Sequence, residues 1–305
     1  MIEARGLVKR YGATAAVNDL SFTVRPGLVT GFLGPNGAGK TTTMRLILGL
    51  DRPSAGSVTV NGHPYAASPA PMREVGALLD AGAVHGGRTA RNHLLGLAQT
   101  NGISRRRVDE VLGIVGLSDV AGKRARGFSL GMRQRLGIAA ALLGDPRILM
   151  FDEPVNGLDP EGILWIRNLM RSLAGEGRTV LVSSHLMSEM EYTADHLLVI
   201  GRGQLIADCG MAEFIGRGSG RAVRVRTPQP GALARAVAAA GGTVASPGAD
   251  DGECEVRGLT EDQVSDLAFA HGIRLTHLAA TRVSLEQAFM ELTADSVEYR
   301  AELPA

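Results

Sequence analysis

The sequence predicts an α/β fold whose mainly parallel sheet is covered by helices on both faces. Short apolar runs at 29–33, 148–151 and 179–183 alternate with helical patterns, as buried parallel strands do. A Gly-rich segment at 34–41 joins the first run to a helical pattern, and two carboxylates follow the second run. Ligands of such sheets bind beyond the carboxyl ends of the strands, so these segments predict a binding site at that edge.

The first part of the chain also contains patterns outside this sheet. Alternating apolar residues at 20–24 predict a half-buried strand, and residues 58–60 predict another strand before a hairpin turn at 61–62. Residues from about 85 to 145 have mostly helical patterns, with Gly, Asp and Ser at the joints. We therefore expect a helical segment inserted between strands of the sheet.

A second, smaller domain is predicted after a Gly-rich linker at 216–220. The pattern then restarts as strand 221–227, helix 231–240, hairpin 243–257, helix 261–271, strand 273–280 and helix 284–293. Residues 221–305 are thus expected to form a small α+β accessory domain. They contain no phosphate-binding pattern, so we do not expect them to be catalytic.

Composition excludes several classes of protein. The 32 basic and 31 acidic residues leave a net charge of +1, which provides no global field for gathering nucleic acid. The longest uncharged apolar stretch, 136–144, is far shorter than the ~20 residues of a membrane span. The N-terminus lacks the apolar segment of a signal peptide. Cys209 and Cys254 have no metal-type spacing, which is typical of a reducing cytoplasm.

One segment matches the phosphate-binding P-loop pattern Gly-x4-Gly-Lys-Ser/Thr; it is Gly34-Pro35-Asn36-Gly37-Ala38-Gly39-Lys40-Thr41. Its glycines let backbone N–H groups surround a phosphate at a helix N-terminus. Lys40 is expected to reach the β- and γ-phosphates, and Thr41 to hold Mg²⁺. Only three of the 32 basic residues are lysines, so a lysine here indicates a need for a compact ammonium. The arginine bias itself indicates a GC-rich bacterial genome.

The two carboxylates after the strand 148–151 complete a nucleotide site. Asp152 suits the shell of Mg²⁺, and Glu153 suits a base that polarises an attacking water. Strand ends often carry Asp, so this pair is informative only together with the phosphate loop. The pair and the loop predict hydrolysis of a nucleoside triphosphate.

Further stretches follow in the order of one known family. Phe128-Ser129-Leu130-Gly131-Met132 resembles the signature Leu-Ser-Gly-Gly-Gln, with its serine and second glycine kept and Leu130 and Met132 departing. Residues 156–159, Asn-Gly-Leu-Asp, resemble the D-loop, and His185 resembles the switch histidine. Tyr11 stands where the family stacks an aromatic ring on adenine, and Asp80 where its Q-loop has Gln. Residues 1–215 thus resemble the ATP-binding subunit of an ATP-binding cassette (ABC) transporter.

The resemblance implies the fold and the site in detail. The fold is a P-loop NTPase core with an antiparallel β subdomain and an α-helical signature subdomain at about 85–145. ATP and Mg²⁺ are the implied ligands. The implied ATP-binding residues are Tyr11, Val17, Gly34, Pro35, Asn36, Gly37, Ala38, Gly39, Lys40, Thr41 and Thr42. The implied catalytic residues are Glu153 and His185, the metal site is formed by Thr41, Asp152 and Asp80, and contacts to the ATP of a partner subunit come from Ser129, Gly131 and Asp159.

Several of these residues also have a purely structural interpretation. Tyr11 is compatible with a core aromatic and Val17 with a core valine. Ser129 precedes a helical pattern and can be its N-cap, which does not exclude a contact with ATP. Asp80 can cap a turn at Ala81-Gly82, because Asp is a common turn former.

The function implied by the resemblance is ATP hydrolysis that powers export. A homodimer of ATP-binding subunits would act with a separate membrane permease, at the cytoplasmic face of a bacterial membrane. The run 75–80 is most similar to the bacitracin and lantibiotic branch of drug and antibiotic exporters, which implies a role in antibiotic resistance. Translation-associated and chromosome-maintenance cassettes do not fit, because this chain has one phosphate loop and no long coiled coil. A kinase or GTPase is disfavoured by the signature and the histidine.

Overall fold

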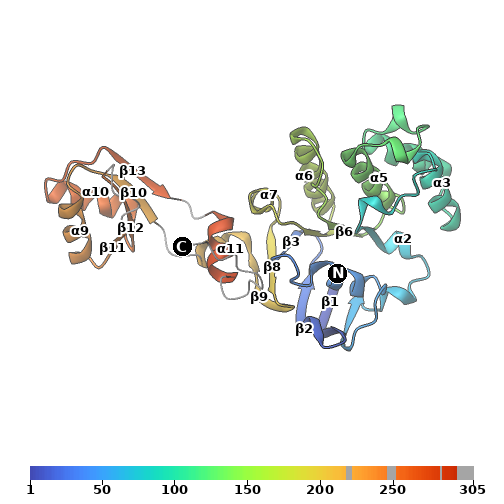
Figure 1. Ribbon diagram of the computed structural model, residues 1–305, viewed down its shortest axis with the longest axis horizontal. Coiled ribbons are helices and arrows are strands. Elements are labelled where there is room, and N and C mark those ends of the chain that lie inside the picture. Colours follow the sequence, from blue (N-terminus) through green and yellow to red (C-terminus); the bar gives the residue numbers. More distant parts are fainter. Residues whose placement is uncertain (218–221, 246–251, 282–283, 294–305) are drawn as a thin grey trace. The chain divides into compact units, whose positions relative to one another are not determined.

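The computed structural model describes residues 1–217, 222–245, 252–281 and 284–293 (Figure 1). The chain divides into two compact units, Met1–Met211 and Ala212–Ala294. The linker expected at 216–220 begins inside helix α8 (Met211–Arg217), and residues 218–220 lie outside the described residues. Among the described helices, none combines the length and apolar character that a membrane span requires.

A six-stranded sheet forms the centre of the first unit, with the order β5-β6-β7-β3-β8-β9. Its strands are β3 (Val29–Leu33), β5 (Val75–Leu78), β6 (Ile148–Asp152), β7 (Thr179–Ser183), β8 (His196–Gly201) and β9 (Gln204–Gly210). All neighbouring strands are parallel except the β8–β9 hairpin. The predicted mainly parallel sheet is therefore confirmed.

Helices follow most of these strands. Helix α1 (Lys40–Ile47) follows β3, α6 (Pro160–Gly175) follows β6 and α7 (Met187–Glu191) follows β7, whereas α2 (Pro71–Glu74) precedes β5. The short 3-10 turns are η1 (Tyr65–Ala67), η2 (Ala81–Ala83), η3 (Ser118–Val120) and η4 (Ala125–Gly127). The predicted helical segment contains α3 (Ala90–Thr100), α4 (Arg105–Ile114) and α5 (Leu130–Leu142), drawn in green in Figure 1. Helix α5 approaches β5 closely, since a Cβ on Gly137 would lie 2.5 Å from Leu78 Cδ1.

A second sheet of the first unit is antiparallel and contains β1 (Ile2–Tyr11), β2 (Thr14–Val24) and β4 (Ala55–Val60), in the order β2-β1-β4. It shares an apolar core with the central sheet, and the rings of Phe22 and Phe32 lie 6.0 Å apart. The predicted turn at Asn61-Gly62 is present, and φ is positive at both residues. After the turn, the two segments, both within the described residues, pair through a single antiparallel bridge between Val60 and His63, and no extended hairpin forms. Strand β4 pairs with β1 instead.

The second unit contains β10 (Ala222–Arg226), α9 (Pro230–Ala239), β11 (Thr243–Ala245), β12 (Glu253–Arg257), α10 (Glu261–Ala270), β13 (His277–Thr281) and α11 (Leu285–Thr293). The strands form an antiparallel sheet in the order β11-β12-β10-β13. Up to β13 this is the βαββαβ arrangement of ferredoxin-like domains. Val225, Leu233 and Val264 contribute to its apolar core. Arg224 of β10 and Glu253 of β12 form an ion pair, with Nε and Oε1 3.6 Å apart.

Candidate functional site

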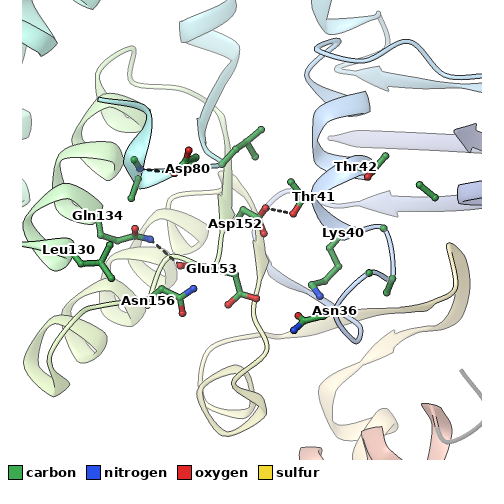
Figure 2. Close-up of a pocket in the computed structure, with 17 residues that line it drawn as sticks. Asn36, Lys40, Thr41, Thr42, Asp80, Leu130, Gln134, Asp152, Glu153 and Asn156 are labelled. Carbon is green, nitrogen blue, oxygen red and sulfur yellow. Dashed lines mark hydrogen bonds between the residues drawn. The ribbon is translucent and has the colours of Figure 1, made fainter. Parts of the chain in front are cut away.

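A cavity of about 620 Å³ lies at the carboxyl ends of β3, β5 and β6. The phosphate loop and the start of α1 line one side of it, and residues 79–82 and the first turns of α5 line other parts. Figure 2 shows Lys40 and Thr41 on one side, Leu130 and Gln134 on the other, and Asp152 and Glu153 between them. A cavity therefore lies at the carboxyl ends of the strands, where the sequence predicts a binding site.

The glycines of the phosphate loop are required by close backbone contacts. Gly39 has φ of 100°, and a Cβ there would lie 2.3 Å from Ala16 O. A Cβ on Gly34 would lie 2.5 Å from Ile200 O, so side chains at either position would collide with main chain from β2 or β8. The loop therefore keeps its shape only with glycine at these positions.

Lys40 is the buried cation of the cavity. Its side chain is 8% exposed, and Nζ donates hydrogen bonds to Gly34 O at 2.7 Å and Pro35 O at 3.2 Å. Burial lowers the pKa of the Lys40 ammonium, and the negative charges of Glu153 and Asp152 oppose that shift. An anion placed in the cavity would stabilise the charged form of this buried ammonium.

Thr41 and Asp152 contact each other in the lining of the cavity. Thr41 Oγ1 donates to Asp152 Oδ2 at 2.6 Å, and Ser183 Oγ donates to Asp152 Oδ1. A hydroxyl beside a carboxylate is the oxygen donor set that suits Mg²⁺, which usually keeps several waters and binds substrate phosphates. The residues therefore fit this ion, although among the described residues no group of three His, Cys, Asp or Glu side chains forms a metal cage.

Glu153 is held in an unusual backbone conformation. Its φ is +50°, a left-handed value that costs a non-glycine residue about 1–3 kcal/mol. Two side chains hold it there: Ser183 Oγ accepts from Glu153 N at 3.0 Å, and Gln134 Nε2 donates to Glu153 O at 3.0 Å. The carboxylate contacts His185, whose Nδ1 lies 2.7 Å from Glu153 Oε2. The structure thus brings together the two residues expected to be catalytic.

Ser129, Gly131 and Asp159 do not line this cavity. Ser129 is the N-cap of α5 and accepts from Met132 N at 3.2 Å, as the structural interpretation predicts. Asp159 is the N-cap of α6 and accepts from Gly162 N at 2.9 Å. Their contacts with the ATP of a second subunit stay a prediction.

Tyr11 and Val17 also lie outside the cavity lining. Tyr11 is 50% exposed, and its hydroxyl donates to Asp51 at 3.2 Å while Lys9 Nζ lies 4.9 Å from its ring. It is therefore not a core aromatic, and its role as a stacking platform stays a prediction. Val17 is fully buried in the core, whereas its neighbour Ala16 lines the cavity.

Of the remaining loop residues, Asn36, Gly37, Ala38, Gly39 and Thr42 line the cavity. Sequence reasoning missed two polar residues of the site. Ser183 pairs with Asp152 in the register of β6 and β7, which only strand order reveals. Gln134 is buried on α5. In the sequence, the only sign of its role is a polar residue on the apolar face of a helical pattern.

Asp80 caps a turn, as its structural interpretation predicts, and its role at the metal site stays a prediction. It is the N-cap of η2, where Oδ1 accepts from Gly82 N at 2.6 Å, and it lines the cavity. Since an asparagine can make the same capping bond, Asp80→Asn removes the charge and keeps the turn. We expect the Mg²⁺ concentration for half-maximal ATPase activity to rise roughly 5-fold, which corresponds to about 1 kcal/mol. Titrating ATPase activity with Mg²⁺ checks this, and superimposable curves would leave Asp80 as a turn residue only.

The chain is similar to known proteins over both units. A family model described as ABC transporter matches residues 17–156, and a family described as a domain of unknown function matches residues 221–286. The bacitracin transport ATP-binding protein BcrA of Bacillus licheniformis is 43% identical over 211 residues, which cover 68% of this chain and 69% of that protein. The daunorubicin resistance ATP-binding protein DrrA3 of Streptomyces coeruleorubidus is 35% identical over 313 residues and 96% of each chain.

A solved structure shares the fold of the first unit. It is an ATP-binding subunit of an ABC transporter, 28% identical, with a TM-score of 0.65 over 70% of this chain and 91% of that chain. These similarities confirm the fold and the resemblance that the motifs predict.

Proposed function

The chain belongs to the family of ABC transporter ATP-binding proteins, and on that premise we propose that its ATP hydrolysis powers export of a drug, antibiotic or peptide. The export would pass through a separate membrane permease, with this chain bound at the cytoplasmic face. The observation that carries the proposal is the similarity to DrrA3, a daunorubicin resistance protein, over 96% of both chains, because it includes the second unit as well as the cassette. The similarity to BcrA, a bacitracin transport protein, supports the same branch.

The geometry supports a division of work among the residues of the cavity. Lys40 and the N-terminus of α1 would bind the β- and γ-phosphates, because both present positive charge to the cavity. Thr41 and Asp152 would hold Mg²⁺, which neutralises charge on the phosphates when it is bound. The Glu153 carboxylate would accept a proton from the attacking water, and His185, which contacts it, would help to orient it.

We further propose that two copies of the chain form the complete sites. Ser129 and Gly131 lie at the N-terminus of α5 but do not line the cavity of their own subunit. Leu130, which lies between them and lines the cavity, is 53% exposed, so this end of the helix is accessible to solvent. A helix N-terminus stabilises phosphate charge, so in a head-to-tail dimer it would face the nucleotide of the second copy.

The export function is tested by sequencing the genes beside this one and co-expressing the chain, in a drug-sensitive bacterium, with any membrane protein that they encode. We expect the two proteins to co-purify and the inhibitory concentration of bacitracin, a lantibiotic or daunorubicin to rise. A Glu153→Gln chain with the same permease should co-purify and give no resistance. ATP hydrolysis by a chain that binds no membrane protein and changes no drug sensitivity would contradict export and leave the ATPase assignment intact.

A further inference from the structure

Gln134 lies on the second turn of α5 and is only 3% exposed. Its amide donates to the main-chain carbonyl of Glu153 at 3.0 Å (Figure 2). A buried side chain of this kind loses free energy unless its polar atoms are bonded, so the contact holds both partners in place. The residue it holds is the one with the left-handed backbone next to Asp152.

A second contact joins the same two segments. Gly157 has φ of +74°, and a Cβ there would lie 2.4 Å from Leu130 Cδ2. A Cβ on Gly131 would lie 2.7 Å from Gly157 O. The first turn of α5 therefore packs directly on the connection between β6 and α6. Leu130 makes this contact at a position where the family signature has glycine.

We infer that Gln134 is a positioning residue for Glu153, through which α5 sets the direction of the catalytic carboxylate. This inference rests on the proposed role of Glu153 as the base. The left-handed φ of Glu153 turns its side chain toward His185, while the Ser183 and Gln134 bonds fix its N–H and C=O. Glu153 O also accepts from Asn156 N at 3.2 Å. Without the Gln134 amide, the carbonyl keeps one of its two described bonds, and the chain can relax toward an ordinary φ.

The expected consequence is a loss of turnover without a loss of binding. A displacement of a catalytic group by about 1 Å can cost on the order of 100-fold in rate. We therefore expect Gln134→Leu, which keeps the volume and removes the amide, to lower kcat by roughly 10- to 100-fold. Lys40 and the phosphate loop do not contact Gln134 through any described hydrogen bond, so KM and the Kd for ATP should change by less than about threefold.

A matched control removes the same kind of bond elsewhere. Thr193 is 2% exposed and its Oγ1 donates to Glu189 O at 2.6 Å, away from the cavity lining. Thr193→Val keeps the shape and deletes this bond, so its thermal midpoint should fall while kcat stays at the wild-type value. If Gln134→Leu and Thr193→Val lower the thermal midpoint equally but only Gln134→Leu lowers kcat, the loss of stability does not explain the loss of turnover.

The pH profile of Gln134→Glu distinguishes a positioning role from a merely structural one. The introduced carboxyl can donate to Glu153 O only when it is protonated, and burial beside a carbonyl raises its pKa above the ordinary glutamate value. The ratio of variant to wild-type kcat should therefore rise as the pH falls. A ratio that does not depend on pH would overturn the inference, and this arm decides the question if Gln134→Leu does not fold.

The remaining outcomes separate this inference from its premise. A Gln134→Leu kcat within twofold of wild type, beside an inactive Glu153→Gln, would overturn the positioning role alone. A loss explained by a raised KM would overturn it as well, since Gln134 would then act on binding. An active Glu153→Gln would refute Glu153 as the base and the positioning role with it.

Discussion

Replacing Glu153 by glutamine is expected to lower kcat for ATP hydrolysis by roughly 100- to 10,000-fold, the usual contribution of a positioned general base. The amide keeps the size of the side chain and cannot accept the proton of the attacking water. Its contact with His185 can persist, because an amide also forms hydrogen bonds. Binding of ATP should remain within a few-fold of wild type, since Lys40 and the loop are unchanged. Phosphate release and equilibrium binding of a fluorescent ATP analogue measure the two effects.

The same variant should accumulate an ATP-bound dimer, because in the proposed dimer the nucleotide between the two copies would no longer be hydrolysed. Light scattering with Mg²⁺ and ATP would detect a doubling of the mass. Glu110→Gln is the matched control, since Glu110 is an exposed residue of α4 that pairs with Arg106 and Arg107. Glu110→Gln should hydrolyse ATP at the wild-type rate. Wild-type turnover by Glu153→Gln would show that another group is the base.

Lys40→Ala should act on binding instead. Hydrogen bonds to a charged group contribute about 1.5–3 kcal/mol, so the Kd for ATP should rise on the order of 10- to 100-fold. Lys40→Arg should not restore affinity, because the planar guanidinium does not fit where a compact ammonium bonds to Gly34 O and Pro35 O. Titration with a fluorescent ATP analogue gives the Kd, and a thermal melt establishes that the loop variants are folded.

The pH dependence of ATP binding should show that Lys40 contributes to the affinity for ATP. Burial lowers the pKa of Lys40 in the free protein, and bound phosphates favour its charged form. ATP affinity should thus be greatest below the lowered pKa and fall as the pH rises through it. Lys40→Ala should lack this alkaline fall. An equal fall in both proteins, or an unchanged Kd for Lys40→Ala, would contradict the assignment.

Local patterns in the sequence were sufficient for the phosphate loop and for the strand that presents Asp152 and Glu153. The glycines of residues 34–41 determine the shape of the loop. A short apolar run followed by two carboxylates can be recognised without knowing which strands lie beside it. The order of elements in the second unit was predicted for the same reason, because turn residues and periodicity are local signals. The sequence also indicated that Ser129 is an N-cap, which the structure confirms.

Only the tertiary structure decided how distant segments meet. The parallel pairing of β6 with β7 brings His185 and Ser183 to Glu153, and no local pattern encodes which strands are neighbours. The packing of α5 on the β6–α6 connection places Gln134 on the Glu153 carbonyl and imposes a left-handed φ that propensity disfavours for glutamate. Strand order and helix packing depend on the apolar surface buried by the whole domain, so these contacts follow from the fold and not from the neighbouring residues.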